Sequence, residues 1–280
     1  MASGTMPLAT RRAAVVVLDA SGVIGRGLLA AALDAGHPVV AVDRNPATLA
    51  ALAAEHPRGS LSVLAGSAAG EADARALATA LRGLGHPLAV VLSAVDASGL
   101  RGRLLDQPAD ATCNALQCAL EPQLAAVRHL LPLLHHGGRY VLVGGPGGQH
   151  PWAGQGQRSL VEAALRMLAR VLHDEARAVG TRLQLLSVAT PTCGLHAGAP
   201  RPHWPTALQI GQRAIQLLGD RHGEPVGDAP GGGEGCDAQR HLDHRGPARR
   251  FVHRLGEDPR EQGQAEGDAL TERLRRQLGA

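Results

Sequence analysis

The stretch AAVVVLDASGVIG, residues 13–25, determines how the whole chain is interpreted. Its first part, Ala13–Leu18, is a continuous apolar run rich in Val, as expected of a strand buried on both faces of a sheet. Gly22 and Gly25 follow at once, and a helical pattern over Arg26–Ala35 comes after them. A strand, a glycine turn and a helix in this order predict the opening of a βαβ unit.

The same alternation continues along most of the chain. Runs of strand length alternate with stretches whose apolar residues recur every three or four positions. We therefore predict a Rossmann-type α/β fold, a doubly wound parallel sheet with helices on both faces. Gly36 should end the first helix, and Pro122 should kink the helix over 111–135 or start a new one. The other expected strands are Pro38–Val42, Leu61–Ala65, Leu88–Ser93, Arg139–Val143 and Leu183–Ala189, and the other expected helices are Ala47–Glu55, Glu71–Leu84, 111–135 and 159–179.

Composition divides the chain into one folded domain and two flanking segments. We expect an N-terminal extension over 1–12, the Rossmann domain over 13–228, and a Gly-rich linker with a polar, disordered tail over 229–280. The glycine-rich run Pro230–Gly235 marks the start of the change. Beyond it, few apolar residues remain to offset the conformational entropy lost on ordering the chain.

Charge and hydropathy exclude several classes of function. The 28 positively charged residues are all Arg, and they are dispersed among acids without a basic run that carries aromatic residues. We therefore expect no nucleic-acid partner. No apolar run approaches the ~20 residues that span a bilayer, and the N-terminus lacks the pattern of a signal peptide, so we expect a cytoplasmic protein with no membrane partner. The four Cys residues lack zinc-site spacing, and no metal is expected.

The glycine turn and the next strand predict a dinucleotide site. Glycine lets the backbone approach a pyrophosphate, which the N-terminus of the following helix attracts. Asp43 closes the second strand, where an acid accepts hydrogen bonds from the adenosine ribose and repels a 2′-phosphate, so NAD is favoured over NADP. Arg44 weakens that preference. In the alternative, the glycines serve only close packing of helix on strand. The expected cofactor-binding residues are Asp19, Ser21, Gly22, Ile24, Gly25, Asp43, Arg44 and Ser93.

From about residue 13 to residue 194 the chain resembles the short-chain dehydrogenase/reductase family. The segment VLDASGVIG, residues 17–25, is similar to the glycine turn of that family, and VAVD, residues 40–43, is similar to its second strand. The resemblance implies a Rossmann fold and a nicotinamide dinucleotide cofactor. Asp19 replaces the first glycine of the family's turn. Asp tolerates left-handed backbone better than most residues, but its carboxylate should weaken phosphate binding.

The same resemblance implies that the family's acid/base machinery is missing. The family uses a Tyr as general acid/base and a Lys four residues later that lowers the pKa of the Tyr. Aligned on AALRMLAR, residues 163–170, these positions hold Arg158 and Glu162. The chain contains no Lys, and its only Tyr, Tyr140, falls within a predicted strand. The family's strand-end Ser, its helix Asn, the start of its NNAG motif and its Asp after the third strand correspond to Gly144 or Gly145, Ala119, Ser93 and Gly66.

Two residues near the expected substrate position remain as candidates for catalysis. His150 has a side chain that titrates near neutral pH, and Arg158 can polarise a carbonyl or hold a carboxylate. The plainer expectation for Arg158 and Glu162, four residues apart on one helix, is a surface ion pair. Ser159 and Cys193 have no recognisable base to activate them.

Two functions are compatible with this pattern. The first is a non-catalytic subunit, or pseudoenzyme, that pairs with a catalytically intact member of the family. The resemblance implies that helices 111–135 and 159–179 pack against a second subunit, in a homo-oligomer or a hetero-oligomer. The alternative is an NAD(P)-dependent oxidoreductase, or a repurposed non-redox enzyme, that uses other acid/base residues in the same cleft. A retained fold without the family's catalytic residues favours the first.

Overall fold

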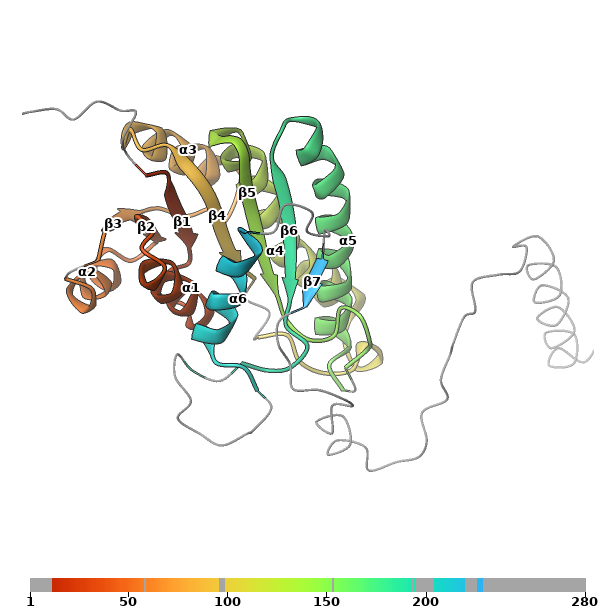
Figure 1. The fold of residues 1–280 in the computed structure, drawn as a ribbon. Coiled ribbons are helices and arrows are strands. Elements are labelled where there is room, and N and C mark those ends of the chain that lie inside the picture. The colour runs from red at the N-terminus through yellow and green to blue at the C-terminus, as the bar shows by residue number, and fades with distance from the viewer. Residues whose placement is uncertain are drawn as a thin grey trace, which may run out of the picture. The chain divides into compact units, whose positions relative to one another are not determined.

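Seven strands form one parallel sheet: β1 (Ala14–Leu18), β2 (Val39–Asp43), β3 (Leu61–Ala65), β4 (Leu88–Ala94), β5 (Leu134–Gly144), β6 (Arg182–Ser187) and β7 (Val226–Asp228). Their order is β3-β2-β1-β4-β5-β6-β7. The computed structural model describes residues 12–57, 59–95, 99–152, 154–192, 194, 204–219 and 226–228. The chain runs outward from β1 to β3 and then returns beside β1 as β4 (Figure 1). This reversal is the topological switch point of a doubly wound sheet.

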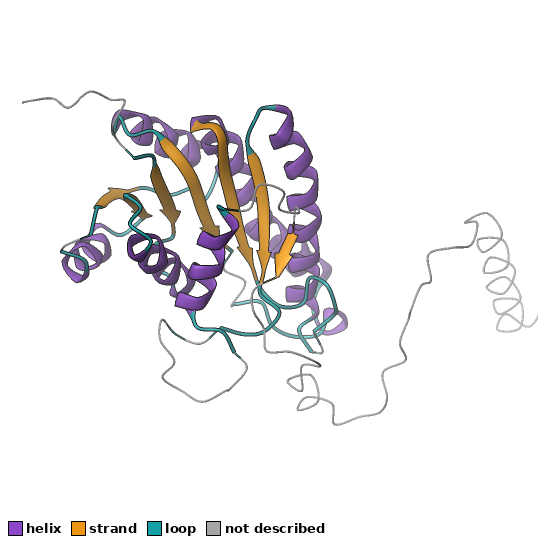
Figure 2. Ribbon diagram, in the orientation of Figure 1, coloured by secondary structure: helices purple, strands orange, loops and turns teal. Residues whose placement is uncertain are grey.

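Helices cover both faces of the sheet (Figure 2). They are α1 (Val23–Asp34), α2 (Pro46–Glu55), α3 (Glu71–Gly83), α4 (Ala109–Leu130), α5 (Gly156–Ala178) and α6 (Ala207–Leu217), with short 3-10 turns η2 (Leu104–Asp106) and η3 (Leu131–Leu133). The core on one face combines side chains of α1, α2 and α6. The core on the other face combines side chains of α3, α4 and α5.

The central strand β1 supplies both cores, because successive side chains of a strand point to opposite faces. Val15 and Val17 pack beneath α1, α2 and α6, whereas Val16 and Leu18 pack beneath α3, α4 and α5. All five residues of β1 are buried. A continuous apolar run was the sequence pattern that predicted this strand, and burial on both faces is the physical reason for the pattern.

Helices α1 and α6 approach each other closely at two glycines. A Cβ atom on Gly27 would lie 2.0 Å from the carbonyl oxygen of Ala207, and a Cβ atom on Gly211 would lie 2.1 Å from the carbonyl oxygen of Gly27. Any side chain at either position would therefore push the helices apart. The contact holds α6 against the helix that follows the glycine turn.

The predicted doubly wound parallel sheet is confirmed, but several element boundaries differ. The first helix begins at Val23, three residues before its predicted start. The predicted helix 111–135 ends at Leu130, and His135 lies in β5. Pro132 has no backbone N–H with which to continue the α-helical hydrogen bonds, and the chain tightens there into η3. Pro122 starts no new helix, because α4 continues through it.

Helix α6 and strand β7 were not predicted. The tail predicted over 229–280 and most of the extension predicted over 1–12 lie outside the described residues. In the part of the chain that the structure describes, none of the helices is both long and apolar enough to cross a membrane.

Candidate functional site

A cleft of about 320 Å³ lies at the carboxyl ends of β1 to β4, beside the middle of α4. Sheets of this kind bind ligands at this edge, next to the topological switch point. Four of the predicted cofactor-binding residues line the cleft: Asp19, Asp43, Arg44 and Ser93. The structure therefore brings together residues that are up to 74 positions apart in the sequence, from Asp19 to Ser93.

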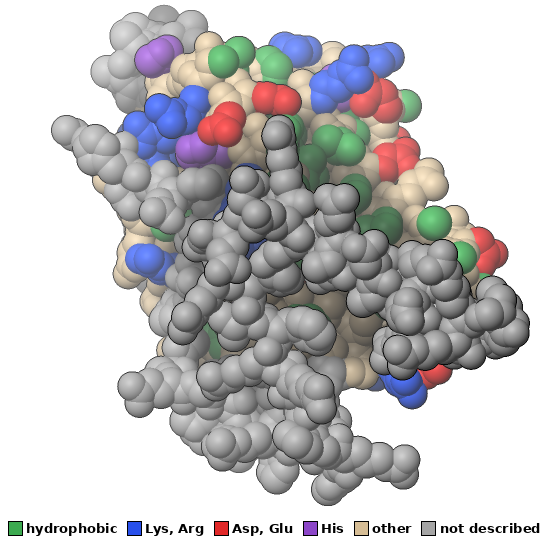
Figure 3. All heavy atoms as spheres, turned by 90° about the vertical axis from the view of Figure 1, so that its right-hand side faces the viewer, with side chains coloured by type: hydrophobic (Ala, Val, Ile, Leu, Met, Phe, Trp, Pro, Cys, Tyr) green, Lys and Arg blue, Asp and Glu red, His purple; other side chains and the backbone are tan. Residues whose placement is uncertain are grey.

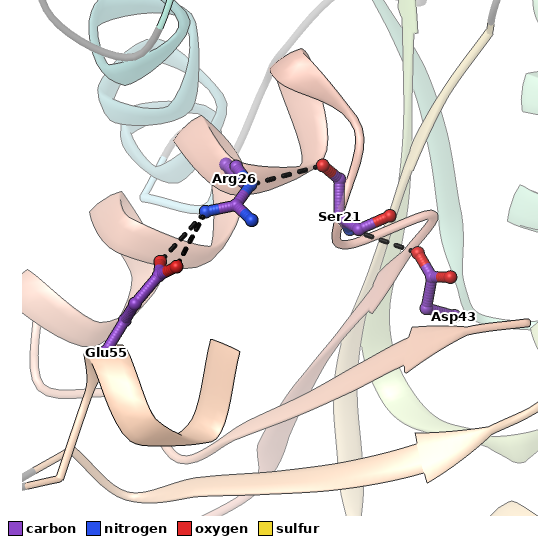
Figure 4. A network of polar contacts seen from close by, with 4 residues as sticks. All are labelled: Ser21, Arg26, Asp43 and Glu55. Atoms are coloured by element: carbon purple, nitrogen blue, oxygen red, sulfur yellow. Dashed lines mark hydrogen bonds and ion pairs between the residues drawn. The ribbon is translucent and has the colours of Figure 1, made fainter. Parts of the chain in front are cut away.

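Asp43 and Ser21 are joined by a hydrogen bond across this edge. The backbone N–H of Ser21 donates to Asp43 Oδ2 at 3.1 Å, and the N–H of Asn45 donates to Asp43 Oδ1 at 3.1 Å. The carbonyl oxygen of Ser21 accepts from Arg26 Nε at 3.2 Å, and Arg26 in turn pairs with Glu55 Oε2 at 2.8 Å (Figure 4). Both backbone groups of Ser21 are thus held in place.

The Asp43 carboxylate is ionised at neutral pH. Burial by itself raises the pKa of Asp43, but hydrogen bonds from Ser21, Asn45 and Arg44 outweigh burial and hold the pKa below its usual value. The backbone N–H groups of Ser21, Asn45 and Arg44 and the Ser21 side chain all act on this carboxylate. A carboxylate offers about four acceptor positions, so a ribose hydroxyl would have to displace one of these donors, and the Ser21 hydroxyl is the one that can rotate away.

Asp19, which the sequence resemblance aligned with the first glycine of the family's turn, has left-handed backbone. Its φ of 51° is the only positive φ of a non-glycine residue in the described ranges. Its Oδ2 atom lies against Gly22, because a Cβ atom added there would be 2.6 Å from it. Gly22 is the N-cap residue of α1. The carboxylate therefore lies at the helix N-terminus, where a phosphate would bind.

The glycines of the turn are also required by packing. A Cβ atom on Gly25 would lie 2.0 Å from the carbonyl oxygen of Asp19, so Gly25 allows α1 to lie directly on the turn. The side chain of Ile24 packs against the core beneath α1 and is not part of the cleft lining. The packing explanation therefore accounts for Gly25 without a ligand, and it leaves the cleft itself unexplained.

A buried polar residue of the cleft was missed by the sequence analysis. Gln123, on α4, lines the cleft and is buried, and its Oε1 atom accepts a hydrogen bond from Ser93 Oγ at 3.1 Å. A buried amide and a buried hydroxyl thus meet where β4 ends. Its position next to Pro122, on the buried side of an amphipathic helix, was the available signal.

Glu162 is not on the surface, so the predicted surface position of its pair with Arg158 is wrong. The Glu162 side chain is 3% exposed, and its carboxyl group lies against the end of β5. A Cβ atom on Gly144 would be 2.9 Å from Glu162 Oε2, and a Cβ atom on Gly145 would be 2.7 Å from Glu162 Oε1. Burial raises the pKa of Glu162 to about 7, while the Gly145 N–H and the Arg158 guanidinium act in the opposite direction.

The two candidates for catalysis differ in their surroundings. Arg158 lies over the ring of Trp152, with 5.2 Å from the guanidinium carbon to the ring centroid. His150 is exposed in the loop between β5 and α5. Neither side chain lines the cleft described above. Ser159 accepts a hydrogen bond from the backbone N–H of Trp152 at 2.8 Å, so its hydroxyl has a structural role.

Tyr140 cannot replace the family's Tyr. Its side chain is fully buried within β5, and burial raises its pKa far above the usual value. Ala119 and Gly66, at the positions of the family's Asn and Asp, line the cleft without a polar side chain. Within the described residues, no group of three or more His, Cys, Asp or Glu side chains is placed to hold a metal ion.

Comparison by sequence finds no family model that matches the chain and no curated protein that matches it. Comparison of structures finds many matches among short-chain dehydrogenases. A short-chain dehydrogenase from Streptomyces avermitilis superposes with a TM-score of 0.67 and 17% identity, over 96% of this chain and 98% of that protein. The match therefore covers almost the whole of both chains.

Two further matches were solved with a nicotinamide cofactor. The NADPH-bound short-chain oxidoreductase from Pseudomonas aeruginosa, described as having an atypical catalytic centre, has a TM-score of 0.68 and 19% identity, over 79% of this chain and 96% of that protein. A short-chain dehydrogenase/reductase from Burkholderia phymatum in complex with NAD has a TM-score of 0.64 and 14% identity, over 77% and 89%. Together these matches establish that the chain has the short-chain dehydrogenase/reductase fold.

Proposed function

We propose that this chain, which has the fold of the short-chain dehydrogenases/reductases, binds a nicotinamide dinucleotide and acts as a non-catalytic subunit. The observation that carries the proposal is the pair of residues at the positions of the family's Tyr and Lys. At the first position, Arg158 lies over the ring of Trp152. At the second, the buried Glu162 carboxyl fills the space that a side chain on Gly144 or Gly145 would need. A general acid/base phenol with a neighbouring ammonium group cannot be assembled from a chain with no Lys and one buried Tyr.

The cleft supports NAD as the cofactor in preference to NADP. Asp43 is ionised at the end of β2, where a ribose diol that displaces the Ser21 hydroxyl would donate to its carboxylate. A 2′-phosphate placed there would be repelled by this charge, although the neighbouring Arg44 reduces the repulsion. The structurally similar proteins were solved with NAD in one case and NADPH in another.

The partner surface that we propose is the outer face of α4 and α5. A groove of about 840 Å³ lies along these helices, lined mainly by Leu, Val, Ala and Pro side chains. Several large apolar side chains are exposed on the two helices and at the C-cap of α5: Leu124, Leu160, Met167, Val171 and Val179. Apolar side chains lie among charged ones on the face that Figure 3 presents. Exposed apolar surface of this extent marks an interaction site, so we infer a second subunit, either a copy or a catalytically intact relative.

Purification from the native host tests the subunit proposal. A short-chain dehydrogenase that co-purifies, and whose activity falls when Leu124 or Met167 of this chain is changed to Asp, would support it. The recombinant protein alone should show no NAD(P)H-dependent reduction across a panel of carbonyl substrates. We also infer a cytoplasmic location, since Cys113 and Cys118 are free cysteines.

Glu162 favours a second candidate function, an oxidoreductase or a non-redox enzyme with a different acid/base group. A carboxyl with a pKa of about 7 is well matched to proton transfer at neutral pH. Turnover by the purified chain that is lost in Glu162→Gln would establish this candidate and remove the first. Turnover that is lost instead in His150→Asn would assign the role to His150.

A further inference from the structure

The loop after β5 folds back onto the first turns of α5 through its glycines. The loop begins with the sequence GGPGG, residues 144–148. A Cβ atom on Gly148 would be 2.8 Å from the backbone carbonyl oxygen of Glu162, and one on Gly147 would be 3.0 Å from Ser159 Oγ. Gly147 also has a φ of 109°. Together with Gly144 and Gly145, which lie against the Glu162 carboxyl, every glycine of this run packs on α5 without room for a side chain.

The far end of the loop is attached to the same two turns of α5. The backbone N–H of Trp152 donates to Ser159 Oγ at 2.8 Å, and Arg158 lies 5.2 Å from the Trp152 ring centroid. The segment 144–152 is therefore held at both ends by residues 158–162. Between its ends, His150 is exposed.

Glu162 places a carboxyl group in this contact, and burial of the ionised form is costly at neutral pH. Its Oε1 atom is buried and makes no hydrogen bond of regular geometry with a described residue. The charged group that acts on its pKa is Arg158 on the same helix, and the Gly145 N–H acts in the same direction. Arg166 lies one turn further along α5.

We propose that residues 144–152 form a pH-sensitive latch, which the neutral form of Glu162 keeps closed on α5 and the ionised form releases. An ionised carboxylate with an unsatisfied oxygen is unfavourable in a protein interior. Movement of the loop admits water to the carboxylate at little cost elsewhere, because four glycines in five residues allow many backbone conformations. The latch does not depend on dinucleotide binding or on the subunit role proposed above.

Trp152 reports directly on the position of the loop. The chain has two Trp residues, Trp152 and Trp204, so Trp204→Phe leaves a single reporter in the latch. In that background, Trp152 fluorescence and its quenching by acrylamide should change in one step centred near pH 7, with greater quenching at high pH. Glu162→Gln should abolish the step, since glutamine has the same shape and does not ionise. His150→Asn should leave it unchanged.

Three results would overturn the proposal: no step between pH 5 and 9, a step that remains in Glu162→Gln, or a step that disappears with His150. Hydrogen exchange in the unmodified protein gives an independent measurement if Glu162→Gln fails to fold. Backbone amides of residues 147–152 should exchange about tenfold faster at pH 8.5 than at pH 5.5 after correction for intrinsic rates. Equal corrected rates would show that the loop stays closed. The matched control is Glu175→Gln, an exposed carboxyl on the same helix.

Discussion

The close contact between α1 and α6 gives a sharp test of the scaffold beneath the cleft. Gly27→Ala would place a Cβ atom 2.0 Å from the Ala207 carbonyl oxygen, where ordinary contacts begin near 3.4 Å. We expect α6 to withdraw by roughly 1 Å, which loosens its buried residues Ile210, Ala214 and Leu217 from the core. Overpacking of this kind costs about 1–3 kcal/mol of the free energy of unfolding.

Thermal and urea unfolding measure this loss. For a domain of this size we expect Gly27→Ala to lower Tm by roughly 3–10 °C. The matched control is Gly83→Ala at the exposed end of α3, where an added Cβ atom would meet nothing within 4 Å. That change should raise stability by about 0.5–1 kcal/mol, because alanine is the better helix former. A Gly27→Ala protein as stable as wild type would show that the close contact between the two helices is absent.

The remaining predictions concern the cleft and Glu162. Asp19→Gly should tighten NAD binding by ~1 kcal/mol, about fivefold, because one partly screened like-charge contact with the pyrophosphate is removed; calorimetry that shows no heat with NAD for either protein would leave the turn as a packing device. Asp43→Ala should weaken NAD binding and reduce the difference in affinity between NAD and NADP. It should also lower the free energy of unfolding by about 1–3 kcal/mol, because the hydrogen bonds from Ser21 and Asn45 are lost. The pKa of Glu162 is raised from 4.5 to about 7. The free energy of unfolding should therefore be highest below pH 4.5 and should fall as the pH rises through 7, by about 3 kcal/mol in total. Glu162→Gln should flatten this decline in urea unfolding series from pH 5 to 9, and an unchanged slope would contradict the shifted pKa.

The sheet could be predicted because its strands are buried on both faces and therefore read as continuous apolar runs. Helix α6 was overlooked although its signals are present in the sequence. Its apolar residues recur at helical spacing, and Thr206 and Gln209 form a capping box at its start. Strand β7 is three residues long and includes a glycine, which is too little for a periodic pattern.

The sequence predicted those parts of the site that depend on residues close together in the chain, and it missed those that depend on contacts between separate elements. Asp43 was placed correctly because the end of a strand is readable from the sequence. The burial of Glu162 was not readable, since an Arg and a Glu four residues apart have the same spacing whether the helix face is exposed or covered. What covers Glu162 is the backbone of Gly144 and Gly145, which belong to another element. Gln123 was missed for the same reason, because its partner Ser93 lies 30 residues earlier on β4.

The hydrogen bonds around Ser21 imply a pattern of variation among natural relatives of this chain. Asp43 interacts with both the side chain and the backbone N–H of Ser21, so position 21 should keep a small hydroxyl residue such as Ser or Thr. Position 43 should be restricted to acceptors such as Asp or Asn. Arg26 and Glu55 contact each other through side chains, so these two positions should co-vary, with loss of one charge accompanied by loss of the other.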